Sequence, residues 1–169
     1  MTNIRKLQRR LAERQGLNKP KGSNESITRS VDYHNPIAGL FLDDERKPSD
    51  VNWIRYNPDI RWQIVRDPSE FTKAIAERDY EAYSFDYYLG GLYNSDAGLD
   101  MLKKLNEKWK QIPPKLIPHM YFHSRHEDPS GDRRKNGAWI MERYWETEMF
   151  EWLLEQEDAK PTPNPTQPV

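Results

Sequence analysis

The sequence contains no cysteine, so it can form neither a disulfide framework nor a thiolate metal site. It also has no apolar stretch close to the roughly 20 residues that span a bilayer. The N-terminal residues 1–16 lack the apolar run of a secretory signal. We therefore expect a cytoplasmic location. A length of 169 residues allows one domain with its own core and no covalent cross-links.

The net charge of −1 hides a strong asymmetry along the chain. Residues 1–30 carry eight Lys or Arg and two acidic residues, whereas residues 31–158 carry 17 basic and 25 acidic residues. We therefore predict a basic N-terminal arm and linker over 1–30, an acidic α/β domain over 31–158, and a Pro-rich disordered tail over 159–169. The arm could bind nucleic acid or an acidic protein. The acidic body repels bare phosphate unless a cation intervenes.

Strand and helix signals alternate between these two ends. Residues 37–42 (IAGLFL) form a continuous apolar run, which is typical of a strand buried on both faces. Asp67 is expected to cap a helix that has Pro68 at its first position. The pattern predicts strands over residues 37–42, 62–65, 82–85 and 119–122, and helices over residues 69–78, 97–109 and 137–157. This order indicates a doubly wound, three-layer α/β fold with a mostly parallel sheet of four to five strands.

Acidic residues follow two of the predicted strands. Asp43 and Asp44 follow the first strand, and Asp86 follows the third. In a sheet ordered 2-1-3-4 these ends converge in the crevice where parallel α/β folds bind ligands. Three carboxylates in one crevice need a counter-charge. Mg²⁺ prefers oxygen ligands, so we predict that Asp43, Asp44 and Asp86 hold Mg²⁺, or Mn²⁺ in its place. Asp44 with Asp43 could also be a simple helix N-cap pair.

Residues near the same strand ends are suited to phosphate chemistry. His123 and Ser124 follow the fourth predicted strand, and Arg46 follows the acidic pair. A free imidazole changes its charge near neutral pH, so His123 could act as a general acid or base beside Asp86. Arg46 and Ser124 could donate hydrogen bonds to phosphate oxygens. We expect Arg125, the next residue in the chain, to assist in binding phosphate.

Three segments together resemble a known family. They are LFLDDERKP (40–48), SFDYYLGG (84–91) and YFHS (121–124). They are similar to the receiver fold of response regulators, and most similar to its offshoot, the cyclic-phosphate-processing receiver-like domains. The resemblance covers about residues 37–145. It implies a receiver or flavodoxin-like fold and metal-dependent processing of a cyclic phosphate, on a nucleotide or at an RNA end.

The chain also departs from that family pattern. Tyr88 stands where the family has a second Asp, which removes one possible metal ligand. No fifth strand ending in the Lys of response regulators is evident, which argues against phosphorelay signalling through Asp86. A catalytically degenerate binding protein is therefore the alternative. By analogy with small phage proteins, it would dock a host macromolecule through the basic arm and through Trp145 and Trp152 of the last helix.

Overall fold

The computed structural model describes residues 36–90, 96–124 and 130–158. The predicted basic arm and Pro-rich tail lie outside these residues, so the limits given for them stay predictions. No helix in the described ranges combines the length and apolar character needed to cross a bilayer.

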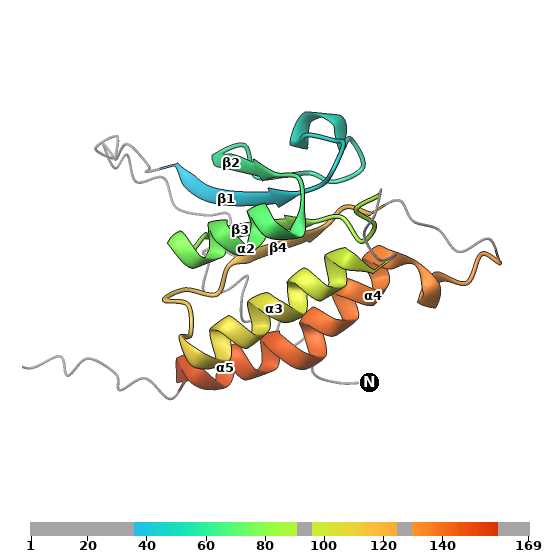
Figure 1. Cartoon of the computed structure of the whole chain (residues 1–169). Coiled ribbons are helices and arrows are strands. Elements are labelled where there is room, and N and C mark those ends of the chain that lie inside the picture. The colour runs from blue at the N-terminus through green and yellow to red at the C-terminus, as the bar shows by residue number, and fades with distance from the viewer. Residues whose placement is uncertain (1–35, 91–95, 125–129, 159–169) are drawn as a thin grey trace, which may run out of the picture. The chain divides into compact units, whose positions relative to one another are not determined.

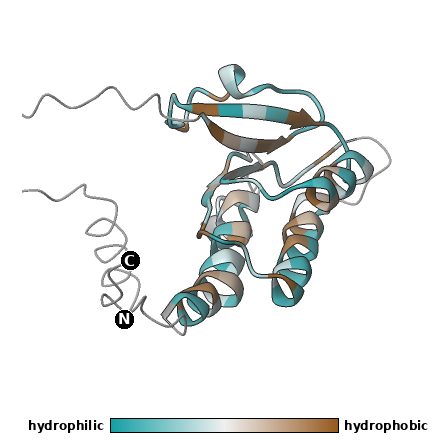
Figure 2. Ribbon diagram, turned by 90° about the vertical axis from the view of Figure 1, so that its left-hand side faces the viewer, coloured by the Kyte–Doolittle hydropathy of each residue, from teal (hydrophilic) through white to brown (hydrophobic). Residues whose placement is uncertain are grey.

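The described part of the chain contains one four-stranded sheet. Its strands are β1 (Ile37–Leu42), β2 (Ile60–Val65), β3 (Ala82–Phe85) and β4 (His119–Phe122). The strand order is β2-β1-β3-β4, and all three neighbouring pairs are parallel. The predicted strand order and the parallel, receiver-like α/β fold class are therefore confirmed. The α-helices of the described residues lie on one face of the sheet only (Figures 1 and 2), so the third layer of the predicted doubly wound fold stays a prediction. β1 is a central strand, which explains why its sequence is an unbroken apolar run.

The helices that follow these strands pack on one face of the sheet, as two views show (Figures 1 and 2). They are α2 (Pro68–Glu77), α3 (Ala97–Gln111), α4 (Gly137–Tyr144) and α5 (Glu151–Asp158). A π-helical segment, η3 (Trp145–Phe150), joins α4 to α5, so the predicted helix over 137–157 is continuous but not uniformly α-helical.

The start of α2 follows the predicted capping pattern. The Asp67 side chain accepts a hydrogen bond from the Glu70 amide at 2.8 Å, and Pro68 occupies the first helical position. The Glu70 carboxylate in turn accepts from the Arg66 amide at 2.7 Å. The first bond satisfies an amide that the helix leaves unpaired, and the second ties the residue before the cap to the first turn. Together they fix the direction of the chain as it leaves β2.

The main core lies between the sheet and these helices. Alternate residues of β1 and β3 point toward the helices, and they meet the apolar stripes of α2, α3 and the C-terminal helices. The fully buried large side chains of this core are Leu40, Leu42, Tyr83, Phe85, Phe71, Leu89, Leu102, Leu105, Trp109, Met141 and Met149.

The opposite face of the sheet is covered by aromatic side chains and not by a helix of the described residues. The Tyr56 ring, from the segment between β1 and β2, packs edge-on against Trp62 and Tyr121 at 5.2 and 5.0 Å. Trp62 and Tyr121 come from the two edge strands. Gly39 makes this layer possible, because a Cβ at this position would lie 2.5 Å from the Trp62 ring. We call Tyr56, Trp62 and Tyr121 the aromatic layer.

We predict that Gly98→Ala destabilises the domain at the β3–α3 junction. A Cβ on Gly98 would lie 1.8 Å from the Asp86 carbonyl oxygen, so backbone must shift. This clash outweighs the gain in helix propensity of about 1 kcal/mol that Ala brings over Gly. Urea denaturation should show that the free energy of unfolding falls by about 2 kcal/mol in Gly98→Ala. Lys104→Ala, an exposed change in the same helix, should stay close to wild type; equal stability of both variants would contradict the prediction.

Candidate functional site

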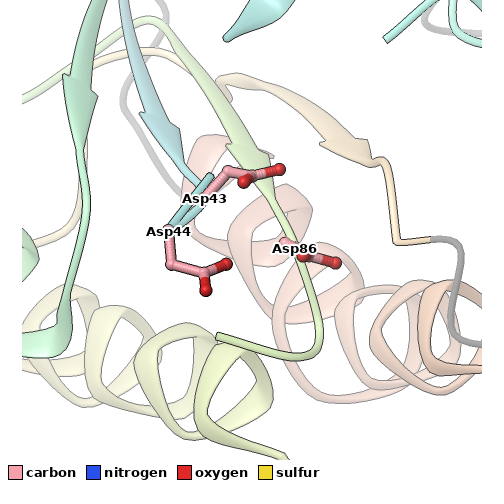
Figure 3. A group of neighbouring side chains, drawn as sticks. All are labelled: Asp43, Asp44 and Asp86. Atoms are coloured by element: carbon pink, nitrogen blue, oxygen red, sulfur yellow. The ribbon is translucent and has the colours of Figure 1, made fainter. Parts of the chain in front are cut away.

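Backbone hydrogen bonds that continue the parallel ladders fix Asp43, Asp86 and His123 at the carboxyl ends of β1, β3 and β4. We call this end of the strands the edge of the sheet at which the site lies. The Asp43 amide donates to the Val65 carbonyl, the Asp86 amide to the Leu42 carbonyl, and the His123 amide to the Phe85 carbonyl, at 2.9–3.2 Å. The carboxylates of Asp43, Asp44 and Asp86 therefore come together as predicted, with one oxygen from each lying within 4.8 Å of the others. Figure 3 shows the three side chains at the ends of β1 and β3.

The Asp43 carboxylate is fully buried and accepts four hydrogen bonds. Its Oδ1 accepts from the amides of Glu45 and Arg46 at 2.8 and 2.6 Å. Its Oδ2 accepts from Arg46 Nε at 2.7 Å and from His123 Nε2 at 3.0 Å. Burial raises the pKa of Asp43, but the bonds from His123 and the two amides, with the charge of Arg46, bring it down to about 2. Asp43 is therefore a fixed anion at neutral pH.

Arg46 is the counter-ion that the structure places between two of the carboxylates. Its guanidinium pairs with Asp43 through Nε and with Asp86 Oδ2 through Nη2, the latter at 2.5 Å. The guanidinium also lies over the Trp53 ring, 5.5 Å from its centroid. Arg66, just after β2, donates to the carbonyl oxygens of Asp43 and Arg46 and so holds the turn between them.

Asp86 and Asp44 retain acceptor capacity that Asp43 lacks. Asp86 is 4% exposed, and its Oδ1 is buried without a hydrogen-bond partner. Asp44 is half-buried. Burial raises the pKa of Asp44, and the neighbouring charges of Asp43, Glu45 and Asp86 add to the effect. Gly90 has a φ of 40°, and a Cβ there would meet the Asp44 carboxylate. Gly90 therefore lets the segment after β3 pass close to the Asp44 carboxylate.

The donor set fits a hard divalent cation. It consists of carboxylate oxygens only, and one of them, Asp86 Oδ1, is a buried acceptor without a donor. Such an orphaned acceptor is costly unless a cation or water satisfies it. Three carboxylates suit any divalent cation that prefers oxygen ligands, and they do not specify which of these cations binds. Tyr88 is exposed, and its phenol adds no carboxylate to this set.

The other predicted site residues occupy different environments. His123 is fully buried, and both of its ring nitrogens are hydrogen-bonded inside the protein, so its role as a general acid or base stays a prediction. Ser124 is 7% exposed at the end of β4. Arg125 lies outside the described residues. Arg46 contacts the carboxylates, and its predicted role in phosphate binding requires it to leave them.

A family model gives this site its context. The model for the cyclic-phosphate processing receiver domain matches residues 38–138, which include the three carboxylates and all of the sheet except Ile37 at the start of β1. The chain belongs to the cyclic-phosphate processing receiver domain family. No curated protein and no solved structure matches the chain. This family assignment agrees with the resemblance that the strand-end motifs indicated.

Three residues contribute to the site of this cyclic-phosphate processing receiver domain without having been predicted to do so. Arg66 supports the turn that carries Asp43, and Ser84 and Tyr56 extend the hydrogen bonds of His123. Ser84 could have been found, because it lies two residues before Asp86 and a strand places such residues on the same face. Tyr56 lies in an irregular segment that has no periodicity to interpret.

We predict that Arg46→Gln lowers the free energy of unfolding by about 2 kcal/mol or more, because it leaves buried carboxylates without their counter-ion. Arg134→Gln is a matched control. Arg134 also pairs with a carboxylate, that of Asp132, but it is 77% exposed. Removing such a surface pair should change the free energy of unfolding far less than Arg46→Gln does. Urea denaturation at neutral pH measures both, and equal effects would show that the Arg46 pairs contribute no more than a surface pair.

The lowered pKa of Asp43 predicts a specific acid sensitivity. A carboxyl whose pKa falls from 3.8 to about 2 on folding stabilises the protein above about pH 4. That contribution, about 2 kcal/mol, is lost as the pH falls through the folded-state pKa. The difference in unfolding free energy between wild type and Asp43→Asn should therefore shrink between about pH 5 and pH 2. A difference that stays constant over this range would contradict the assignment.

Proposed function

We propose that this chain is a metal-dependent phosphoesterase that opens a cyclic phosphate on a nucleotide or at an RNA end. The main support is the orphaned oxygen of Asp86, which lies beside two further carboxylates in a domain of the cyclic-phosphate processing family. In the reaction, water attacks the phosphorus and one ring P–O bond breaks. The released oxygen takes a proton, and the product is a phosphate monoester.

Asp43, Asp44 and Asp86 are the residues that would hold the metal. Asp86 offers a buried oxygen without a donor, and Asp44 offers the most exposed carboxylate of the three. A bound Mg²⁺ or Mn²⁺ supplies Lewis acidity and neutralises negative charge on the phosphate. The acidic body needs this neutralisation, because its net charge otherwise repels the substrate.

Arg46 is the residue best placed to bind the substrate phosphate. It is only 26% exposed while it pairs with Asp43 and Asp86. When another cation balances these carboxylates, its guanidinium becomes available for a bidentate contact with phosphate oxygens. Ser124 follows β4 at the same edge of the sheet and would provide a further donor, as would Arg125, the next residue in the sequence. The basic residues of 1–30 would guide an RNA end toward this edge.

Hydrolysis assays test the proposed reaction. With Mg²⁺ or Mn²⁺ present, the full-length chain should convert 2′,3′-cyclic nucleotides, or RNA ending in a 2′,3′-cyclic phosphate, to monoesters. Asp86→Asn should lower the rate at least 100-fold, since a carboxylate that holds the metal is removed. Asp132→Asn, which alters a carboxylate paired with Arg134, is the control and should retain the wild-type rate. No turnover with either metal, or equal rates in both variants, would refute the proposal.

A thermal melt tests the metal site separately from the chemistry. Mg²⁺ or Mn²⁺ at a hundredfold its dissociation constant should stabilise the protein by about 2.7 kcal/mol, which raises the melting temperature by several degrees. EDTA should reverse the shift, and Asp86→Asn should abolish it. An unchanged melting temperature at millimolar metal would show that the three carboxylates do not bind a divalent cation.

A non-catalytic binding protein is the second candidate function. Arg46 balances the charges of Asp43 and Asp86 from within the protein, an arrangement that a degenerate site would retain. Such a chain, phage-encoded or not, would bind a host macromolecule through the basic residues of 1–30 and the C-terminal helix. Trp145 packs against Trp109 with 6.2 Å between ring centroids, and Trp145 and Trp152 are half-buried, so only part of each ring is available to a partner. Absence of both turnover and a metal-dependent melting shift would favour this function.

A further inference from the structure

We infer that Tyr56, Ser84 and His123 form a positioning relay that orients the Asp43 carboxylate. In this relay His123 is a fixed hydrogen-bond donor and not a group that exchanges protons with substrate. The consequence for metal affinity rests on the proposed function, whereas the arrangement of hydrogens in the relay does not depend on it.

The relay is a continuous series of hydrogen bonds between residues distant in the sequence. The Tyr56 hydroxyl lies 2.9 Å from Ser84 Oγ, and Ser84 Oγ lies 2.7 Å from His123 Nδ1. His123 Nε2 then lies 3.0 Å from Asp43 Oδ2. The series therefore runs from the aromatic layer, across the sheet face, to the most buried carboxylate of the site.

The direction of each bond follows from the chemistry of the groups. Both oxygens of the Asp43 carboxylate already accept from groups that can only donate, two backbone amides and Arg46 Nε, so Asp43 acts as an acceptor and His123 Nε2 carries the hydrogen. Ser84 has one hydroxyl hydrogen, and when it donates to Nδ1 it accepts from Tyr56. In this arrangement every hydrogen in the relay has an acceptor. If Nδ1 carried a hydrogen instead, Ser84 would donate to Tyr56, and the relay would offer the Tyr56 hydrogen no acceptor.

The surroundings of His123 argue against direct contact with substrate. The ring is fully buried and stacks on Phe41, with 4.4 Å between centroids and 12° between planes. Both nitrogens are used inside the protein, by Ser84 and by Asp43. A general acid or base must come within hydrogen-bond reach of the reacting atom, directly or through one water. The burial of His123 makes it suited instead to holding another residue in place.

The aromatic layer fixes the outer end of the relay. The Tyr56 ring is in edge contact with Phe41, Trp62 and Tyr121, at 5.0–6.3 Å between centroids. Burial raises the pKa of the Tyr56 hydroxyl to about 12, so it keeps its hydrogen at neutral pH. Each group of the relay is therefore held by packing as well as by its hydrogen bonds. Partners of this kind orient metal-binding side chains, and their loss commonly weakens metal binding.

Nitrogen NMR tests the relay without metal or substrate. Long-range ¹H–¹⁵N spectra at pH 7.5 should show the His123 ring protonated at Nε2 and unprotonated at Nδ1. Ser84→Ala removes the donor to Nδ1 and should shift the Nδ1 resonance, as should Tyr56→Phe to a smaller extent. Tyr121→Phe is the matched control, because it removes a hydroxyl from the same aromatic layer and leaves the relay intact. A His123 ring protonated at Nδ1, or equal shifts in all three variants, would overturn the inference.

Calorimetric titration of the same proteins with MgCl₂ or MnCl₂ measures how the relay affects the affinity of the three carboxylates for a metal. We expect the dissociation constant to rise about tenfold in Ser84→Ala and about threefold in Tyr56→Phe, as for other residues that support metal ligands. Tyr121→Phe should bind like wild type. Wild-type affinity in a folded Ser84→Ala protein would overturn the positioning role. If the wild type binds neither metal, the proposed function fails, and the NMR spectra alone decide whether the relay exists.

Discussion

The site depends on the four hydrogen bonds that the Asp43 carboxylate accepts. Two come from backbone amides of its own turn, one from Arg46 and one from His123. A buried anion without such donors would be far less stable. These bonds link the end of β1 to β4, and through Arg46 they link it to Asp86 at the end of β3. One side chain thus joins the three strand ends at which the function is expected.

The arrangement of charge at this edge of the sheet also limits how the site can work. Arg46 compensates Asp43 and Asp86 in the structure, so another cation must compete with an internal guanidinium for the same carboxylates. That competition would lower the apparent affinity for a metal, but it keeps Arg46, the residue proposed to bind phosphate, beside the place where a phosphate would arrive. The same residue would then serve two states of the site, one with ligand and one without.

Much of the fold followed from local pattern. β1, β3 and β4 have the predicted bounds, because short apolar runs between Pro- and Asp-containing loops are clear signals. β2 begins at Ile60, two residues before its predicted start, since Ile60 pairs with Ile37 at the end of the ladder. The meeting of Asp43, Asp44 and Asp86 was predictable from strand order alone. The bond between Arg46 and Asp86 was not, because the sequence does not specify which nearby charge a long side chain will reach.

The π-helical segment η3 explains a regularity in the C-terminal sequence. Met141, Trp145, Met149 and Leu153 are spaced four residues apart and all contact the main core. In a straight α-helix each step of four overshoots a full turn by about 40°, so three steps would turn the last side chain well away from the first. The wider turn of η3 takes up this excess rotation. A strict spacing of four apolar residues in such a helix is therefore a mark of local unwinding. A single deletion within η3 would allow an ordinary α-helix, in which Leu153 would lie only about 20° from the direction of Met141 and would stay on the core face.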